Sequence, residues 1–454
     1  MYGMDLGLIA IIIILIVMTG AIKTKRCIEF MIVGGILSAI VIYKSDFITG
    51  WTNVFLEVMY SEDSVWLVLI CGFFGAFIAL LQESKGTYGF VRIIQKFCNS
   101  EKKSLLTAFI LGILIFIDDY LNIMTIGSCM KKVFDKNKMP RESLAYVIDS
   151  TAAPVCTIVP FSSWAVFFAA LFFQEESVLD LGFTSEMSAY LAAIPFAFYP
   201  IFTVIIVALF SFGLIPKIGG MKKAYDRVAT TGKVYSDSSR RFNQEEEYIG
   251  DGNLLDFILP MALVIILSIS SGDMLFSIMV TVIATFFLYV PRKVVKLDDF
   301  VNLIIKGFCD MLPTVAIVLM GYMLENFLSQ MGLTEFIINN FAPILTPVLL
   351  PAGIFLLVAA ITFTTGSNWG MSAVAIPIVF PLAASIDANI ILTMAAVMSG
   401  GAFGSHACFY SDANLLTSAT CGIDNFEHAG TQLPYVLIAS GLSTIAFIIS
   451  ALVL

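Results

Sequence analysis

The sequence predicts an all-α polytopic membrane protein built from two inverted repeats, each with about five transmembrane helices and one re-entrant hairpin. Of its 454 residues, 59% are hydrophobic and 13% are charged, whereas soluble domains are about 25% charged. Several apolar stretches reach the roughly 20 residues that are needed to cross a bilayer. Lysine and arginine gather in a few loops, and a spacing of glycines in the first half recurs in the second half.

The composition also narrows the class of ligand. The chain has eight cysteines without a C-x-x-C pair and two histidines, so we do not expect a zinc site. The net charge of −9 is spread over loops on both sides of the predicted membrane domain, and we expect no nucleic-acid partner. The expected surroundings are a lipid bilayer, with the chain as a multi-pass protein of the cell (inner) membrane.

The basic clusters orient the first crossings. They lie at 23–26, 85–103, 131–141, 217–241 and 291–296, which the positive-inside rule places in the cytoplasm. The first three predicted crossings are 5–22, 27–43 and 64–82. The first basic cluster follows the stretch 5–22 instead of preceding it, so we interpret that stretch as an uncleaved helix and not as a signal peptide.

A re-entrant hairpin is predicted at 104–130. This apolar stretch has basic segments on both sides, and both segments should be cytoplasmic. Two full crossings need about 40 residues, which is more than the stretch contains. The chain should therefore enter from the cytoplasm and return, with its tip at 116–122. Irregular backbone at membrane depth is tolerated only where it is buried in protein or lines a wet cavity, so we expect this tip to be functional.

The remainder of the first repeat, 1–213, contains a broken crossing at 143–173. Two prolines, Pro154 and Pro160, and several small hydroxyl residues interrupt its helical pattern. The polar stretch 214–253 is predicted to be a cytoplasmic linker between the two halves.

The second repeat, 254–454, is predicted from spacing. Gly75, Gly86 and Phe90 each have an identical residue 246 positions later. These residues are Gly321, Gly332 and Phe336. The same order of elements predicts a second hairpin at 343–385 and a second broken helix at 390–416. Five crossings is an odd number, so the second repeat should insert upside down, as in many secondary transporters. No lysine or arginine follows Lys306, as expected if the second hairpin enters from outside.

Asp118 and Asp119 are the strongest candidates for chemistry. Inserting an Asp at the membrane centre costs a free energy of roughly 2.5–3.5 kcal/mol, so such a residue is expected to have a function. Adjacent residues do not share a helix face, so one Asp should meet an ion and the other should cap a half-helix. A carboxylate that titrates near neutral pH can hold either H⁺ or Na⁺, which is the basis of cation–proton exchange.

Neutral oxygens near the predicted tips and breaks complete the candidate site. The proposed Na⁺ ligands are Asp118, Asn122, Ser367 and Asn368, because Na⁺ is a hard cation that prefers oxygen. The wider set of cation- or substrate-binding candidates adds Asp119, Asp149, Ser150, Thr151, Thr365, His406, Ser411 and Asp412. No cofactor is expected beyond Na⁺ and H⁺ as transported or coupling ions.

Several segments of the sequence resemble one known family. They are FIDDY at 116–120, LAYVIDSTAAPVC at 144–156, PFSSW at 160–164, GSHACFYSD at 404–412 and TQLPY at 431–435. These segments resemble the NhaC-type Na⁺/H⁺ antiporter family, which is similar to the larger group of ion transporters with paired hairpins. The resemblance covers nearly the whole chain. It implies a scaffold domain, a moving transport domain and a homodimer.

The chain departs from that family at one carboxylate. The family commonly has Gly-Asp-His-Cys-Ser-Pro-Ile-Ser-Asp in the second half, and here Ser405 stands in place of the first Asp. Relatives that resemble this family exchange organic acids or carry amino acids, and the aromatic Tyr410 would suit such a substrate. Two hypotheses therefore stand side by side: a Na⁺/H⁺ antiporter, and a Na⁺- or H⁺-coupled transporter of a small carboxylate or amino acid.

An intramembrane aspartyl protease is the third hypothesis and the least favoured. The two Asp residues of the first tip are adjacent, not on separate helices, and no Gly-x-Gly-Asp element occurs. We therefore expect the chain not to be an enzyme.

The hairpin makes a topology prediction. Single cysteines placed near 100 and 136 in a cysteine-free background should both react with an impermeant maleimide added from the cytoplasmic side. Labelling of the second cysteine only from outside would mean that 104–130 crosses the membrane once.

Overall fold

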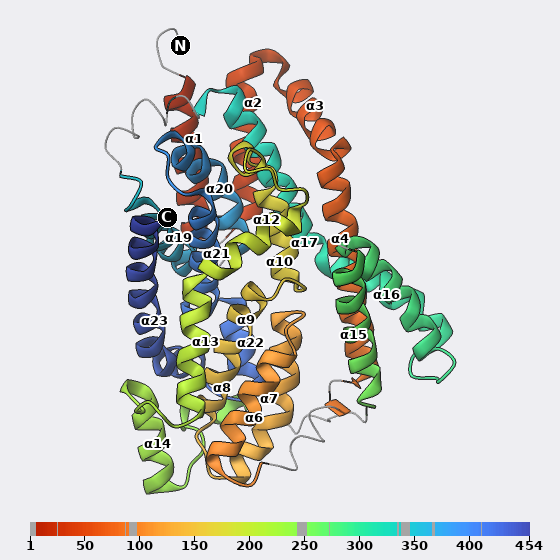
Figure 1. Cartoon of the computed structure of the whole chain (residues 1–454), viewed down its shortest axis with the longest axis vertical. Helices are drawn as coiled ribbons and strands as arrows, with labels where there is room; N and C mark the ends of the chain where they lie inside the picture. The colour runs from red at the N-terminus through yellow and green to blue at the C-terminus, as the bar shows by residue number, and fades with distance from the viewer. Residues whose placement is uncertain are drawn as a thin grey trace.

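The computed structural model describes residues 6–24, 26–86, 88–89, 98–242, 252–271, 273–333, 336, 346–365, 368–409 and 411–454. Helices and connecting turns make up these residues, and no strand occurs among them. The molecule is elongated, with several helices running along its longest axis (Figure 1). The all-helical prediction is confirmed.

The described part of the first half begins with a run of α-helices and one short 3₁₀ helix. They are α1 (Leu6–Thr24), α2 (Cys27–Tyr43), η1 (Lys44–Asp46), α3 (Phe47–Tyr60), α4 (Glu62–Ser84), α6 (Glu101–Leu114), α7 (Asp119–Lys136), α8 (Arg141–Thr151), α9 (Ala153–Ile158), α10 (Ser163–Phe172) and α11 (Glu176–Leu179). The chain continues through α12 (Glu186–Ala193), η2 (Ile194–Phe196) and α13 (Phe198–Ser211) to α14 (Gly219–Thr231) and η3 (Ser238–Phe242). The helix α14 lies inside the predicted polar linker, and the amphipathic α3 precedes the predicted third crossing.

The second half repeats this order with fewer breaks. Its helices are α15 (Leu255–Ser271), α16 (Met274–Tyr289), α17 (Leu297–Gln330), α19 (Leu350–Thr365), α20 (Asn368–Ser385), α21 (Ile390–Ala407), α22 (Asp412–Cys421) and α23 (Asn425–Val453). Many helices begin at a side chain that accepts a backbone N–H, as helix starts require. The capping residues include Ser61, Ser100, Asp118, Ser162, Ser185, Asp273, Asn389, Ser411 and Asp424.

The two halves have corresponding helices at a constant spacing. Five pairs of helices begin 249 residues apart: α1 and α15, α6 and α19, α7 and α20, α8 and α21, and α10 and α22. The helices α4 and α17 end at Ser84 and Gln330, which reproduces the glycine offset of 246. The hairpin α6–α7 lies in the lower part of Figure 1, and α19–α20 lies in the upper part. The inversion of the second set stays a prediction.

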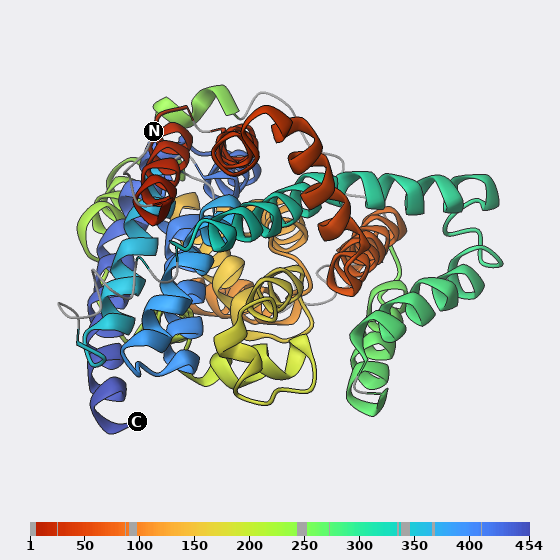
Figure 2. The same cartoon turned by 90° about the horizontal axis from the view of Figure 1, so that it is seen from above.

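Length and hydropathy make five described helices candidates for crossing a membrane. The number rises to seven if two bent pairs each count as one span: α8–α9 with α10, bent by 42°, and α12–η2 with α13, bent by 54°. The helices α15, α16 and the start of α17 stand out from the body as an arm (Figure 2). Ile269 and Phe287 on this arm are 72% and 69% exposed, as expected for side chains that face lipid.

The helices α4 and α17 approach each other closely. A Cβ atom on Gly75 would lie 2.1 Å from the carbonyl oxygen of Gly307, and a Cβ atom on Gly307 would lie 2.3 Å from the backbone of Gly75. Two backbones can approach this closely only where both residues lack a side chain. The two glycines therefore fix how α4 and α17 cross.

We expect Gly75→Ala to lower stability by about 1–3 kcal/mol, because the added methyl group has to push two backbones apart. Thermal unfolding of the purified protein in detergent measures the change. Gly353→Ala on α19 is the matched control, since no atom lies within 4 Å of its added Cβ. That control should be neutral or slightly stabilising. Equal effects of the two substitutions would contradict tight packing at Gly75.

Candidate functional site

The first hairpin has its tip at residues 115–118, between α6 and α7. Asp118 caps α7: one carboxylate oxygen accepts the N–H of Leu121 at 3.0 Å, and the other accepts the hydroxyl of Ser163 at 2.9 Å. The N–H of Ser163 donates to the carbonyl of Ile117 at 2.9 Å. Both carboxylate oxygens of Asp118 are therefore engaged, and the tip is attached to the start of α10.

Asp119 differs from its neighbour. It is 2% exposed, and its Oδ1 has no hydrogen-bond partner within the described part of the chain. Its carboxyl group lies near those of Asp118 and Asp412. Three carboxylates near one helix start create a negative potential that attracts a cation.

The side chain of Asn122 holds the unwound backbone together. Its Nδ2 donates to the carbonyls of Gly112 and Ile115, each at 2.8 Å, and lies 3.4 Å from the carbonyl of Thr151. These acceptors fix the orientation of the amide, so that Oδ1 points away from them. This oxygen is buried and has no partner among the described residues. Because Asn122 lies three positions after Asp119, the two side chains share one face of α7.

Around the second tip, between α19 and α20, the structure describes only part of the residues. Asn368 begins α20 and is 5% exposed, and its Nδ2 has no partner within the described ranges. The ring of Trp369 lies 5.1 Å from that of Trp164 and 4.5 Å from that of Phe167. Since Trp164 directly follows Ser163, these aromatic contacts bring the second tip beside the first.

The break between α21 and α22 lies beside the first tip as well. The Tyr120 hydroxyl donates to the carboxylate of Asp412. The hydroxyl of Ser411 caps α22 and donates to the carbonyl of Ser405 at 2.6 Å. Ser162, which lies 249 residues earlier, caps α10 and donates to the carbonyl of Cys156 at 2.6 Å. Both halves thus close their breaks with the same device.

A second buried polar group lies deeper in the protein and includes the remaining predicted residues. We define the buried polar cluster by its side chains: Asp149, Ser150, Tyr199, His406, His428 and Gln432. Each of these residues is fully buried. The cluster connects α8, α13, α21 and α23.

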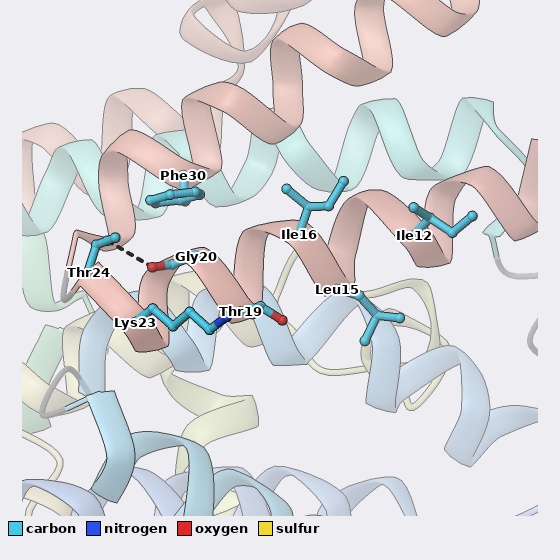
Figure 3. Close-up of a pocket in the computed structure, with 8 residues that line it drawn as sticks. All are labelled: Ile12, Leu15, Ile16, Thr19, Gly20, Lys23, Thr24 and Phe30. Atoms are coloured by element: carbon cyan, nitrogen blue, oxygen red, sulfur yellow. Dashed lines mark hydrogen bonds between the residues drawn. The ribbon is translucent and has the colours of Figure 1, made fainter.

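An apolar groove lies elsewhere, along α1 and the start of α2 (Figure 3). Its wall carries Ile12, Leu15, Ile16 and Phe30, with Lys23 at one end. The described residues that line the groove include no carboxylate.

An acidic cavity of about 450 Å³ lies near the end of α17 and is lined in part by Glu57, Gln174 and Glu325. Glu175, in the loop after α10, is 4% exposed, and its Oε1 has no partner in the described part of the chain. Burial raises the pKa of Glu175 well above its usual value, and the nearby charge of Glu325 raises it further.

Residues 155–452 match the model of the Na⁺/H⁺ antiporter family. The chain belongs to the Na⁺/H⁺ antiporter family. It is 26% identical to an uncharacterized protein of Haemophilus influenzae over 471 aligned positions, which cover 94% of this chain and 88% of that protein. It is 30% identical to an uncharacterized Na⁺/H⁺ antiporter of the same organism over 96 residues, which cover 21% of this chain and 20% of the relative. The predicted resemblance is therefore confirmed.

Two solved transporters have a similar fold. One is MtrF of Neisseria gonorrhoeae, described as one of a class of antimetabolite efflux pumps; it has a TM-score of 0.60 at 14% identity and covers 89% of this chain and 84% of its own. The other is the YdaH transporter of Alcanivorax borkumensis, with a TM-score of 0.56 at 9% identity and coverage of 89% of both chains. The family and the fold make this antiporter-family chain a membrane transport protein.

The structure divides the predicted site residues into two groups. Asp118, Asp119, Asn122, Asn368 and Asp412 lie at or beside the tips, whereas Asp149, Ser150 and His406 belong to the buried polar cluster. Thr151 accepts the Asn122 amide through its backbone, and its hydroxyl donates to Val147 within α8. Ser411 acts as a helix cap. Ser367 and the side chain of Thr365 lie outside the described residues.

Sequence reasoning missed Ser163, Tyr199, His428 and Gln432. One signal was present: His428 and Gln432 are four residues apart at the start of a long helix, a spacing that places two side chains on one face.

Glu175 makes a prediction about stability. Because its folded-state pKa is raised, the folded protein holds this proton more tightly than the unfolded chain, and stability falls as pH rises through that pKa. Glu175→Gln removes the free-energy cost of ionising this buried carboxyl group. The thermal unfolding temperature of the variant should therefore exceed that of the unchanged protein by about 2 °C or more at about pH 8. At about pH 4 the two should agree. An equal difference at both pH values would contradict a protonated Glu175.

Proposed function

We propose that this protein exchanges Na⁺ for H⁺ across the cell membrane, with Na⁺ bound at the first hairpin tip by Asp119 and Asn122. The observation that carries the proposal is the pair of buried oxygens, Asp119 Oδ1 and Asn122 Oδ1, that have no partner among the described residues and share one helix face. Na⁺ is a hard cation that takes carboxylate and amide oxygens, supplemented by the carbonyls of unwound backbone.

The two Asp residues then have different roles. Asp118 has both oxygens engaged as a cap, so the proposal assigns the exchangeable carboxylate to Asp119 instead. A buried carboxylate avoids an uncompensated charge by binding either a cation or a proton. Competition between H⁺ and Na⁺ for Asp119 would couple the two ions without further machinery. We infer that the second set of helices is inverted, because alternating access around one site uses such a pair of repeats.

Transport of a small organic acid or amino acid, coupled to Na⁺ or H⁺, is the second candidate. The aromatic contacts of Trp164, Phe167 and Trp369 between the tips favour it, as does the buried Nε1 of Trp164 beside the carboxyl group of Asp119. An indole N–H is a donor that could meet a substrate carboxylate.

We expect Asp119→Asn to lower the rate of sodium-dependent proton movement by at least about tenfold, because the substitution keeps the shape of the side chain and removes its charge. The assay uses purified protein in proteoliposomes that enclose a pH-sensitive dye, with Na⁺ added outside. Asp118→Asn should mainly lower the yield of folded protein, since loss of a cap costs about 0.5–2 kcal/mol.

Asp180→Asn on the exposed loop after α11 is the matched control and should behave like the unchanged protein. If the Asp119 and Asp118 variants both move protons with unchanged Na⁺ dependence, the coupling site lies elsewhere. Proton movement that needs an added organic or amino acid, tested with a panel of such compounds, would favour the second candidate.

A further inference from the structure

The buried polar cluster contains an acid–imidazole pair that the proposed exchange at the tip does not use. His428 Nε2, from α23, lies 3.1 Å from Asp149 Oδ2, from α8. The same carboxylate oxygen accepts the Nε2–H of Gln432 at 2.7 Å. All three side chains are 0% exposed. The pair joins residues 279 positions apart, one from each predicted repeat.

The rest of the cluster fixes the position of Gln432 and satisfies His406. Gln432 Nε2 also donates to the carbonyl of His406 at 2.6 Å. The ring of His406 has both nitrogens engaged, Nε2 with the Ser150 hydroxyl at 3.0 Å and Nδ1 with the Tyr199 hydroxyl at 2.7 Å. The Gln432 amide therefore has its nitrogen between two acceptors, which sets its orientation. His406 is a satisfied structural residue, whereas the Asp149–His428 pair is not.

Three atoms around the pair have no partner within the part of the chain that the structure describes. They are Asp149 Oδ1, His428 Nδ1 and Gln432 Oε1. An ionised carboxylate with one oxygen unpaired in the protein interior is costly, and a proton removes that cost. The imidazole at 3.1 Å offers a second position for the same proton. A proton needs no added space, which suits a site whose residues are fully buried.

We propose that Asp149 and His428 bind a transported proton at a site separate from the hairpin tip where Na⁺ binds. The inference rests on the proposed Na⁺/H⁺ exchange and adds a second proton position to it. The helix α8 connects the two positions, since it carries Asp149 and ends at Thr151, whose carbonyl lies 3.4 Å from the Asn122 amide. A continuous chain of contacts of this kind can carry coupling between two sites.

The titratable groups near the Asp149–His428 pair are themselves paired or neutral, which favours the pair as the proton-binding site. Among the described residues, the titratable and charged side chains near it are Lys131 on α7, Arg141, Glu142 and Tyr146 on α8, Tyr199 on α13, His406 on α21, Cys421 on α22 and Tyr435 on α23. Arg141 is paired with Asp135 at 2.7 Å. Glu142 already forms a two-pronged ion pair with Arg227, with N–O distances of 2.8 and 2.9 Å. The tyrosines and Cys421 are neutral at physiological pH in their ordinary state.

Infrared difference spectroscopy of the purified protein, taken between two pH values without Na⁺, tests the site directly. A protonated carboxylic acid gives a carbonyl-stretch band that an ionised one does not. Asp119 and Glu175 also take up protons without Na⁺, so we expect the unchanged protein to show several such bands and Asp149→Asn to lose one of them. Asp119→Asn should retain the band of Asp149, and the exposed Asp180→Asn is the control for the chemical change itself.

His428→Gln is the second variant, in case Asp149→Asn folds poorly. Without the imidazole, the carboxylate loses its hydrogen-bond partner at Oδ2, so the frequency of the Asp149 acid band should change. The same purified variant should bind Na⁺ in calorimetry with unchanged affinity, within about threefold. The number of protons released per Na⁺, obtained from buffers of different ionisation enthalpy, should fall.

The outcomes separate this inference from the proposed function. An acid band that is the same in Asp149→Asn, His428→Gln and the unchanged protein overturns the proton site at Asp149. Na⁺ binding that survives Asp119→Asn, together with loss of the band in Asp149→Asn, contradicts the proposed Na⁺ site and leaves the proton site in place. Na⁺ binding lost in Asp149→Asn, in a variant that still unfolds cooperatively, contradicts the separation of the two sites.

Discussion

The hydrogen bonds of the Asn122 side chain are the interaction on which the candidate site depends. Where a helix breaks at membrane depth, its free carbonyls have no water to bond with, and each unsatisfied group costs several kcal/mol. One amide nitrogen on α7 serves the end of α6 through Gly112 and Ile115 and also approaches the end of α8 at Thr151. Without it the unwound tip, and with it the position of Asp119, would not be defined.

The same physical problem is solved in both halves, with different chemistry. Ser162 and Ser411 close equivalent breaks with equivalent bonds, so the backbone of the two halves is treated alike. The first residues of α7 and α20, which are 249 positions apart, are Asp119 in one half and Asn368 in the other. The repeated frame therefore presents one ionisable and one neutral tip.

The sequence was informative where the controlling forces are local. Prolines and hydroxyls next to a break, basic loops and an isolated pair of Asp residues are all visible within a few positions. The helices break at 115–118 and between α9 and α10, close to these signals, whereas the re-entrant path stays a prediction. The choice between Asp118 and Asp119 was out of reach, because it depends on a hydroxyl 45 positions away, that of Ser163. His428 was missed for the same reason, since its partner lies in the other half of the chain. The helix α14 was not predicted, because a polar helix does not stand out from a polar linker by its hydropathy.

The contact between Gly75 and Gly307 has a consequence for how the protein can move. Where Gly75 meets Gly307, α4 and α17 cannot slide along each other without one backbone carbonyl passing over the other backbone, because neither glycine has a side chain that could move aside. The contact between the two glycines therefore holds the crossing of α4 and α17 in place. A movement that exposes the tips first to one side of the membrane and then to the other would have to occur at other contacts. The contact between the rings of Trp164 and Trp369 is a van der Waals contact, so a change in the angle between the rings breaks no hydrogen bond between them. We accordingly expect the crossing of α4 and α17 to stay fixed during transport and the ring contacts between the tips to change.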